Sequence, residues 1–177
     1  MRAIAGTIDW INVTIGKAVA WLSLAIVLLQ LIVVLGRYVF GIGSIQAQES
    51  VTYMHGLLFM LAAAYTLKAD GHVRIDIFYR GAQPRTKAAV NLVGSLFFLI
   101  PMCAVILLVS WSYVARSWAV FEGSRETSGL QAVFLLKTVI LVFAVQLALQ
   151  GVSTVIRSLL AIGGDEAELA ALRHGTG

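Results

Sequence analysis

The chain has 177 residues, of which 59% are hydrophobic and only 12% are charged, and its mean hydropathy is +0.89. Soluble globular domains carry about 25% charged residues, so this composition excludes an ordinary soluble domain and indicates an integral membrane protein. The net charge of +4 needs no nucleic-acid partner, because basic loops beside membrane spans account for it.

Residues 1–17 precede the first long apolar segment and carry isoleucines at helical spacing. These are Ile4, Ile8, Ile11 and Ile15. Asp9 and Asn12 fall off this stripe. The pattern predicts an amphipathic helix lying on the membrane surface ahead of the first span. A plain extension of that span fits the same residues, and both alternatives stay open.

Four segments of the chain contain no Asp, Glu, Lys or Arg. They are residues 18–36, 50–67, 88–115 and 138–156. About 20 apolar residues cross the bilayer core as a helix, so each segment predicts one span. We therefore expect an all-α membrane protein with one four-span domain over the whole chain and short interfacial amphipathic helices. The expected spans lie near residues 18–38, 50–68, 86–116 and 132–157, with a polar tail at 163–177.

Several polar residues stand at the edges of these spans. Arg37 and Tyr38 end the first span, where arginine can extend toward the headgroups and tyrosine suits the interface. Glu49 opens the second, where a carboxylate is favoured at a helix N-terminus, and it could also pair with Arg37 or bind an ion. Lys137 lies about two turns inside the fourth helix. A lysine there is costly, so we expect it to extend outward or to pair with a carboxylate of this chain or of a partner.

The most charged short segment is residues 67–79, between the second and third spans. Gly71 can adopt the left-handed conformation that ends a helix, so Asp70-Gly71 predicts the end of the second span. Beyond it, Ile75 and Phe78 lie on one helical face, which predicts a short helix in the headgroup region. A solvated polar turn is the alternative.

The third apolar segment is the longest, and Pro101 stands in it. Proline cannot donate a backbone hydrogen bond, so we expect a bend there. Cys103 in the same segment is the only cysteine, which excludes an intrachain disulfide.

The distribution of basic residues predicts the orientation of the chain. With four spans, both termini and the 67–79 segment lie on one side of the membrane. Nine of the 13 basic residues belong to that side: Arg2, Lys17, Lys68, Arg74, Arg80, Arg85, Lys87, Arg157 and Arg173. By the positive-inside rule, both termini are expected in the cytoplasm.

No sequence motif supports catalysis, since there is no phosphate-binding loop, no Cys/His metal set and no nucleophile with a credible base. We therefore expect no enzyme and no metal site. The spans also lack the paired repeats and broken helices of a self-sufficient carrier. An accessory membrane subunit fits these features.

Short patterns at the span edges resemble a known family. They are Arg37-Tyr38-Val39-Phe40, Gln48-Glu49, Ala62-Ala63-Ala64-Tyr65-Thr66-Leu67-Lys68, Gly71-His72-Val73-Arg74-Ile75-Asp76, Glu122-Gly123-Ser124, Gly129-Leu130, Lys137 and Leu149-Gln150-Gly151. Over roughly residues 30–157 the chain is similar to the small (DctQ-type) membrane subunit of tripartite ATP-independent periplasmic (TRAP) transporters.

The resemblance implies a bacterial inner-membrane protein without a cofactor of its own, bound to a large multi-span permease subunit that holds the substrate and sodium sites. A periplasmic substrate-binding protein delivers a small organic anion for sodium-driven symport. The small subunit is then a scaffold for the static part of the transporter. Candidate contacts to partners or membrane lipids are Arg37, Tyr38, Glu49, His72, Arg74, Asp76, Lys137 and Gln150.

Two alternatives belong to other functional classes. A haem- or quinone-associated anchor of a respiratory enzyme also has few spans, and His55 is the sole candidate axial ligand inside a span. An autonomous small carrier would use Glu49 or Lys137 as its ionisable group.

Overall fold

The computed structural model describes residues 1–72, 79 and 81–174. These residues form helices and connecting turns, without a strand among them. The helices are α1 (Arg2–Val39), α2 (Ile45–Lys68), α3 (Pro84–Gly94), the π-helix η1 (Ser95–Leu99), α4 (Ile100–Ala119), α5 (Val133–Ile162) and α6 (Glu166–His174). Four segments are long and apolar enough to cross a membrane: α1, α2, the continuous helix through α3, η1 and α4, and α5. The predicted all-α fold with four membrane-spanning helices is confirmed.

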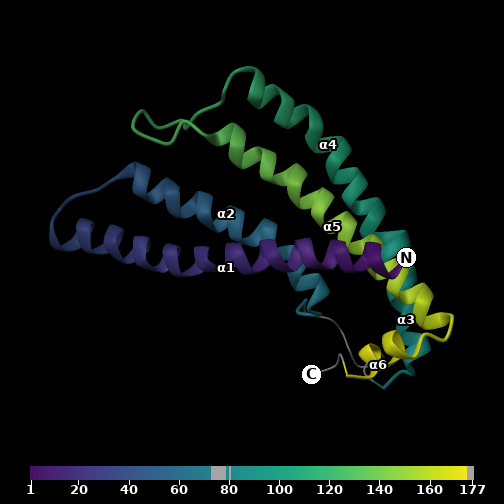
Figure 1. Ribbon diagram of the computed structural model, residues 1–177. Coiled ribbons are helices and arrows are strands. Elements are labelled where there is room, and N and C mark those ends of the chain that lie inside the picture. The colour runs from purple at the N-terminus through teal and green to yellow at the C-terminus, as the bar shows by residue number, and fades with distance from the viewer. Residues whose placement is uncertain (73–78, 80, 175–177) are drawn as a thin grey trace.

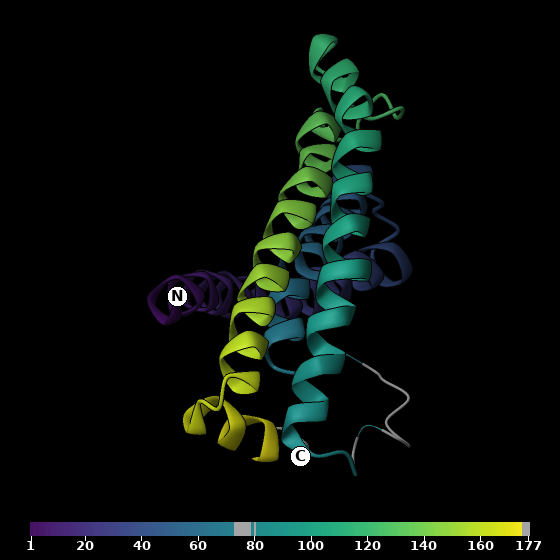
Figure 2. The same ribbon diagram turned by 90° about the vertical axis from the view of Figure 1, so that its right-hand side faces the viewer.

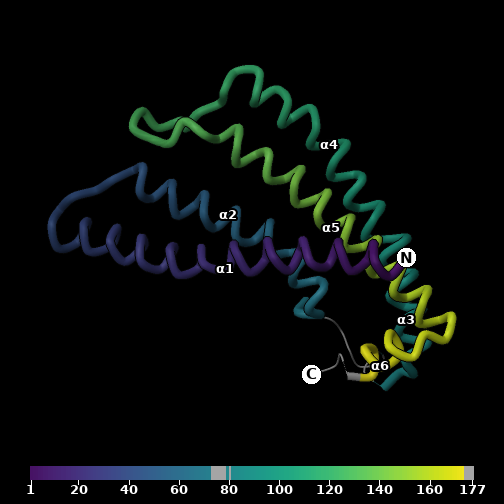
Figure 3. Tube along the Cα trace, in the orientation of Figure 1, coloured from purple at the N-terminus to yellow at the C-terminus, as the bar shows by residue number. Residues whose placement is uncertain are grey.

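The spans form two antiparallel hairpins, α1 with α2 and α4 with α5, as Figure 1 and the Cα trace in Figure 3 show. Figure 2 shows α4 and α5 side by side along their length. Helix α5 packs against every other helix of the described chain, whereas α2 and α3 do not pack against each other. Most buried residues of α5 are small or polar, which is how helices approach closely in a bilayer. Helix α5 therefore organises the fold.

Helix α1 continues without interruption through the segment expected to lie on the surface. At about 1.5 Å per residue its 38 residues extend about 57 Å, well beyond a hydrocarbon core of about 30 Å. Ile4 and Ile11 are exposed, whereas Asp9, Asn12 and Gly16 are buried. The apolar stripe thus faces outward, as suits lipid, and the polar side packs inward. Residues 2–17 thus form one continuous helix with the first span.

Close packing of α1 on α2 depends on Gly16. A Cβ atom added there would lie 2.4 Å from Cβ of Tyr65, which is closer than real side chains approach. The Tyr65 side chain therefore occupies the space that any other residue at position 16 would need.

The second helix ends where the sequence predicts, at Asp70-Gly71, by a Schellman motif. The Gly71 amide donates to the Thr66 carbonyl at 2.9 Å, and the Asp70 amide donates to the Leu67 carbonyl at 3.2 Å. The left-handed residue is Asp70, with φ of 56°, instead of Gly71. Aspartate tolerates this conformation because its short polar side chain can bond locally. The short helix expected after it lies outside the described residues.

The expected bend at Pro101 takes the form of η1. In this wide turn the amide of Ile100 donates to the Ser95 carbonyl, five residues back. A π turn directly before the proline accommodates its missing donor within a continuous helix. Gly151 of α5 faces the turn, where an added Cβ would lie 3.0 Å from a methyl group of Leu99.

Within the polar tail expected at 163–177, residues Glu166–His174 form α6, which packs on α3 and α5. The chain turns at Gly164, whose φ of 93° is unfavourable for other residues. Leu169 is buried in a small core with Ala88 and Ala161. Composition alone missed this helix because its few apolar residues share one face.

Candidate functional site

A buried polar cluster joins the two ends of the chain. We call it the Asp9 cluster, and its members are Asp9, Asn12, Gln150, Ser153, Arg157 and Glu168. Asp9 is only 5% exposed, although it is charged and lies in an apolar helix. Its Oδ1 accepts from Gln150 Nε2 at 2.9 Å and from Ser153 Oγ at 2.7 Å. Its Oδ2 accepts from Nε and Nη2 of Arg157 at 3.0 and 2.6 Å.

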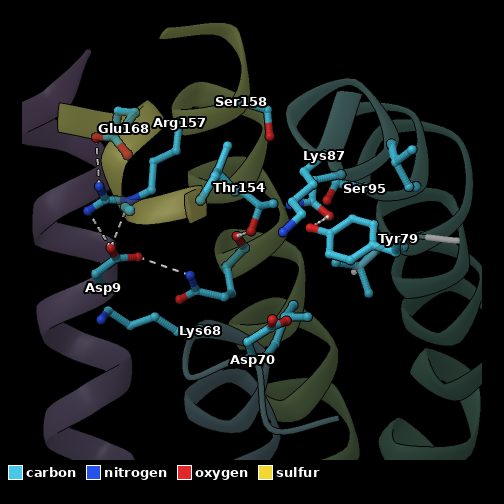
Figure 4. Close-up of a pocket in the computed structure, with 18 residues that line it drawn as sticks. Asp9, Lys68, Asp70, Tyr79, Lys87, Ser95, Thr154, Arg157, Ser158 and Glu168 are labelled. Atoms are coloured by element: carbon cyan, nitrogen blue, oxygen red, sulfur yellow. Dashed lines mark hydrogen bonds and ion pairs between the residues drawn. The ribbon is translucent and has the colours of Figure 1, made fainter. Parts of the chain in front are cut away.

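The remaining bonds of the Asp9 cluster extend it to α6. Arg157 Nη1 donates to Glu168 Oε1 at 2.8 Å, so one guanidinium lies between two carboxylates (Figure 4). Asn12 Nδ2 donates to Gln150 Oε1 at 2.8 Å. Buried charges are tolerated when each is paired and hydrogen-bonded, as these are. The Asp9 cluster fixes the first half of α1 and the whole of α6 to α5.

A second ion pair lies near the same end of the molecule. Arg2 of α1 bonds to Asp165 in the turn between α5 and α6. Burial alone would raise the pKa of the Asp165 carboxyl, but the hydrogen bond and charge of Arg2, together with the backbone amides of Ala167 and Glu168, lower it below its ordinary value. This pair holds the start of α1 beside the α5–α6 turn.

A cavity of about 660 Å³ adjoins the Asp9 cluster. Figure 4 shows it between α1, α2, α3 and α5, with α6 closing one side. Its polar wall includes Lys68, Asp70, Tyr79 and Lys87. The Tyr79 hydroxyl donates to Asn91 Oδ1 at 3.1 Å. The cavity therefore combines charged groups with the apolar sides of two helices that do not touch.

At the opposite end, two carboxylates organise the loop between α4 and α5. Glu49, just after the first turn of α2, accepts a hydrogen bond from the Ser124 hydroxyl and another from the Leu130 amide at 2.6 Å. Glu122 accepts from Ser117 Oγ at 2.7 Å and forms an ion pair with Lys137. We call these residues the loop cluster.

The electrostatics of the loop cluster follow from these bonds. The hydrogen bond from Lys137, helped by the one from Ser117, lowers the pKa of the Glu122 carboxyl. The Lys137 ammonium also lies 4.1 Å from the centre of the Tyr113 ring, within cation–π range. Of the outcomes expected for Lys137, pairing with a carboxylate of this chain is therefore the one found.

The other predicted site residues are spread over the molecule. Arg37 and Tyr38 line a hollow of about 350 Å³ at the end of α1, and Tyr38 is 80% exposed. Glu49 bonds to the loop, and no ion pair joins it to Arg37. His72 is exposed just after α2. Arg74 and Asp76 lie outside the described residues.

Gln150 lies inside the chain and not at its surface. It is 2% exposed, and its amide is bonded to Asn12 and Asp9. Any influence of Gln150 on a partner is therefore indirect, through the position of α1.

Two features bear on the alternative functions. His55 is exposed on α2 and stacks on Phe59, with ring centroids 4.5 Å apart. Over residues 1–72, 79 and 81–174, no three His, Cys, Asp or Glu side chains gather in a way that could hold a metal ion.

Sequence reasoning missed the charged members of the Asp9 cluster. The sequence pattern places Asp9 on the polar side of the first helix, Arg157 among the basic residues that set the orientation, and Glu168 in the polar tail. The one available signal was that Asp9 is the only charged residue between Arg2 and Lys17. Such a charge in a membrane helix requires a partner.

Comparison with known protein families matches most of the chain. The family model described as "Tripartite ATP-independent periplasmic transporters, DctQ component" matches residues 26–161. No curated protein sequence and no solved structure matches the chain. The matched range includes the loop cluster and all of α5 except its last residue, but Asp9 and Glu168 lie outside it.

Proposed function

Because this chain belongs to the DctQ family of TRAP transporters, we propose that it is the small transmembrane scaffold subunit of such a transporter. In this role it supports a large permease subunit during sodium-driven uptake of a small organic anion, which a periplasmic binding protein delivers. The match over residues 26–161 carries the proposal.

The arrangement of polar groups supports a scaffold over an autonomous carrier. Two charged residues inside the spans form ion pairs within the chain: Asp9 with Arg157, and Lys137 with Glu122. Both pairs lie near the helix ends, and each connects segments that would otherwise move separately. A carrier needs ionisable groups that can release their partner during transport. A scaffold needs the reverse, a fixed shape.

The exposed surface is also suited to a larger assembly in the inner membrane. Large apolar side chains are exposed along α1, η1 and α4, including Trp21, Leu28, Phe98 and Leu108. Lipid or the large subunit would cover these faces. Arg37, Tyr38 and His72 remain our candidates for contact with the partner or with headgroups, together with Arg74 and Asp76.

Co-purification tests this function. The chain, expressed with its cognate large permease subunit and solubilised in mild detergent, should elute with it at a fixed stoichiometry. The Arg74→Ala/Asp76→Ala variant should reduce complex yield or uptake without changing substrate affinity of the binding protein. Elution of the wild-type chain apart from the large subunit, under conditions where both are folded, would refute the scaffold role.

Both termini are proposed to be cytoplasmic, because nine of the 13 basic residues lie on their side. Alkaline phosphatase fused at Ser124 should be active, and the same enzyme fused after Arg80 should be inactive. The reverse pattern would invert the orientation.

A further inference from the structure

The cavity beside the Asp9 cluster contains a buried cation, Lys87, that has no anionic partner among the residues that the structure describes. Lys87, in the first turn and a half of α3, is 4% exposed. Its ammonium points into the cavity (Figure 4) and lies 5.6 Å from the centre of the Tyr79 ring. Within the described part of the chain it forms no ion pair. An ammonium has three donors, and burying it without an anion is unfavourable.

The carboxylates around the cavity are already engaged. Asp9 and Glu168 both form ion pairs with Arg157. Asp70 makes an interaction of its own. Ser95 of η1 and Ser158 of α5 also line the cavity, and their hydroxyl groups add hydrogen-bonding capacity. The cavity thus has room and donors for an anion beside Lys87.

The remaining walls indicate what kind of anion fits. Leu67, Val90 and Leu172 provide apolar surface, and α2 and α3 leave the cavity between them because they do not pack together. Val90 is itself exposed on the outer side of α3. A polar pocket with an apolar edge, at the end of membrane-spanning helices, suits a headgroup whose acyl chains continue along the helix.

From these observations we propose that the cavity binds a phosphate group, with Lys87 as its principal contact, and that an anionic phospholipid supplies it. Free phosphate shares the same chemistry, and the experiment distinguishes the two sources. The site would hold a lipid between α2 and α3, where protein packing is missing. Its existence does not depend on the transporter assignment, because the full chain alone forms it.

Native mass spectrometry of the purified full-length chain tests the site. The purified chain is incubated with phosphatidylglycerol or phosphatidylcholine of identical acyl chains, and separately with inorganic phosphate. We expect one retained phosphatidylglycerol and little phosphatidylcholine. Lys87→Met should lower phosphatidylglycerol retention about tenfold, the scale of one charge-assisted hydrogen bond. Lys17→Met is the matched control, because Lys17 is exposed and does not line the cavity.

A second variant blocks the cavity without removing a charge. Gly94 lines the cavity, and a Cβ atom added there would meet no other atom within 4 Å. Gly94→Leu should therefore fold, since leucine also favours a helix, and should reduce retention as Lys87→Met does. Retention of inorganic phosphate alone, sensitive to Lys87→Met, would support the phosphate site with a free source. Equal retention of both lipids, or full retention by Gly94→Leu, would overturn the proposal.

Discussion

Replacing Asp9 by asparagine removes the charge at the centre of the Asp9 cluster while keeping the size of the side chain. Asp9 accepts four hydrogen bonds, one each from Gln150 and Ser153 and two from Arg157. Asparagine has one acceptor oxygen and two N–H donors, so it cannot serve both groups of donors at once. Whichever way the asparagine side chain is turned, its NH2 group faces N–H or O–H donors that a carboxylate oxygen of Asp9 accepts from in the wild-type chain.

The expected cost follows from the exposure of the partner. Removing one member of a fully buried ion pair costs about 3–5 kcal/mol. The Arg157 side chain is 41% exposed and keeps its ion pair with Glu168. We therefore expect Asp9→Asn to lower the free energy of unfolding by a smaller amount, about 2 kcal/mol. For a chain of this length, that corresponds to a fall in Tm of about 4–8 °C.

Cys103 supplies the assay, because it is the only cysteine of the chain and is buried. A thiol-reactive fluorophore added during heating in detergent will report when the helices separate. Asp9→Asn, Arg157→Gln and the double variant form a thermodynamic cycle, for which we expect a coupling energy of about 1 kcal/mol or more. Arg2→Gln is the control, since the Arg2 side chain is 59% exposed and its pair with Asp165 should contribute less than about 1 kcal/mol.

The reasoning would be refuted if Asp9→Asn lowered Tm no more than Arg2→Gln and the cycle showed no coupling. Asp9 and Arg157 would then not stabilise the packing of α1 on α5, in spite of their contact.

Three further predictions concern helix packing and the loop cluster. Gly16→Ala should lower Tm by several degrees because of its clash with Tyr65, whereas Gly6→Ala, with open space around it, should not. The pKa of Glu122 is lowered from its ordinary value of 4.5. The ionised Glu122 carboxylate therefore stabilises the loop fully at pH values above 4.5, and this stabilisation is lost as the pH falls through the lowered pKa. Hydrogen exchange in the α4–α5 loop should accelerate over that range, and Glu122→Gln should abolish the step. Lys137→Met should accelerate hydrogen exchange in the α4–α5 loop at neutral pH. An unchanged exchange rate would show that Lys137 does not order this loop.

The sequence predicts those parts of the fold that depend on local chemistry. Spans follow from the absence of charge over about 20 residues, and the end of α2 follows from Asp70-Gly71. The need of Lys137 for a partner follows from its depth in α5. Its partner Glu122 is only 15 residues away, close enough for the connecting loop to bring them together.

Long-range pairings were not predictable in the same way. Asp9 and Arg157 are 148 residues apart, and nothing in the sequence between them indicates that α1 lies against α5. The isoleucine stripe of α1 shows that the helix has two faces but not which one meets protein. In a soluble protein the apolar face packs inward, whereas in a bilayer either face can. Glu168 likewise lies in a polar C-terminal segment, and nothing in the sequence indicates its contact with Arg157.

Reconstituted uptake tests the scaffold role most directly. Proteoliposomes are prepared with the cognate large permease subunit alone, with this chain alone, and with both, and a sodium gradient is applied in the presence of the loaded binding protein. We expect substrate uptake only where both membrane subunits are present, and no counterflow by this chain alone. Counterflow by the chain alone, or full uptake by the large subunit without it, would contradict the scaffold function.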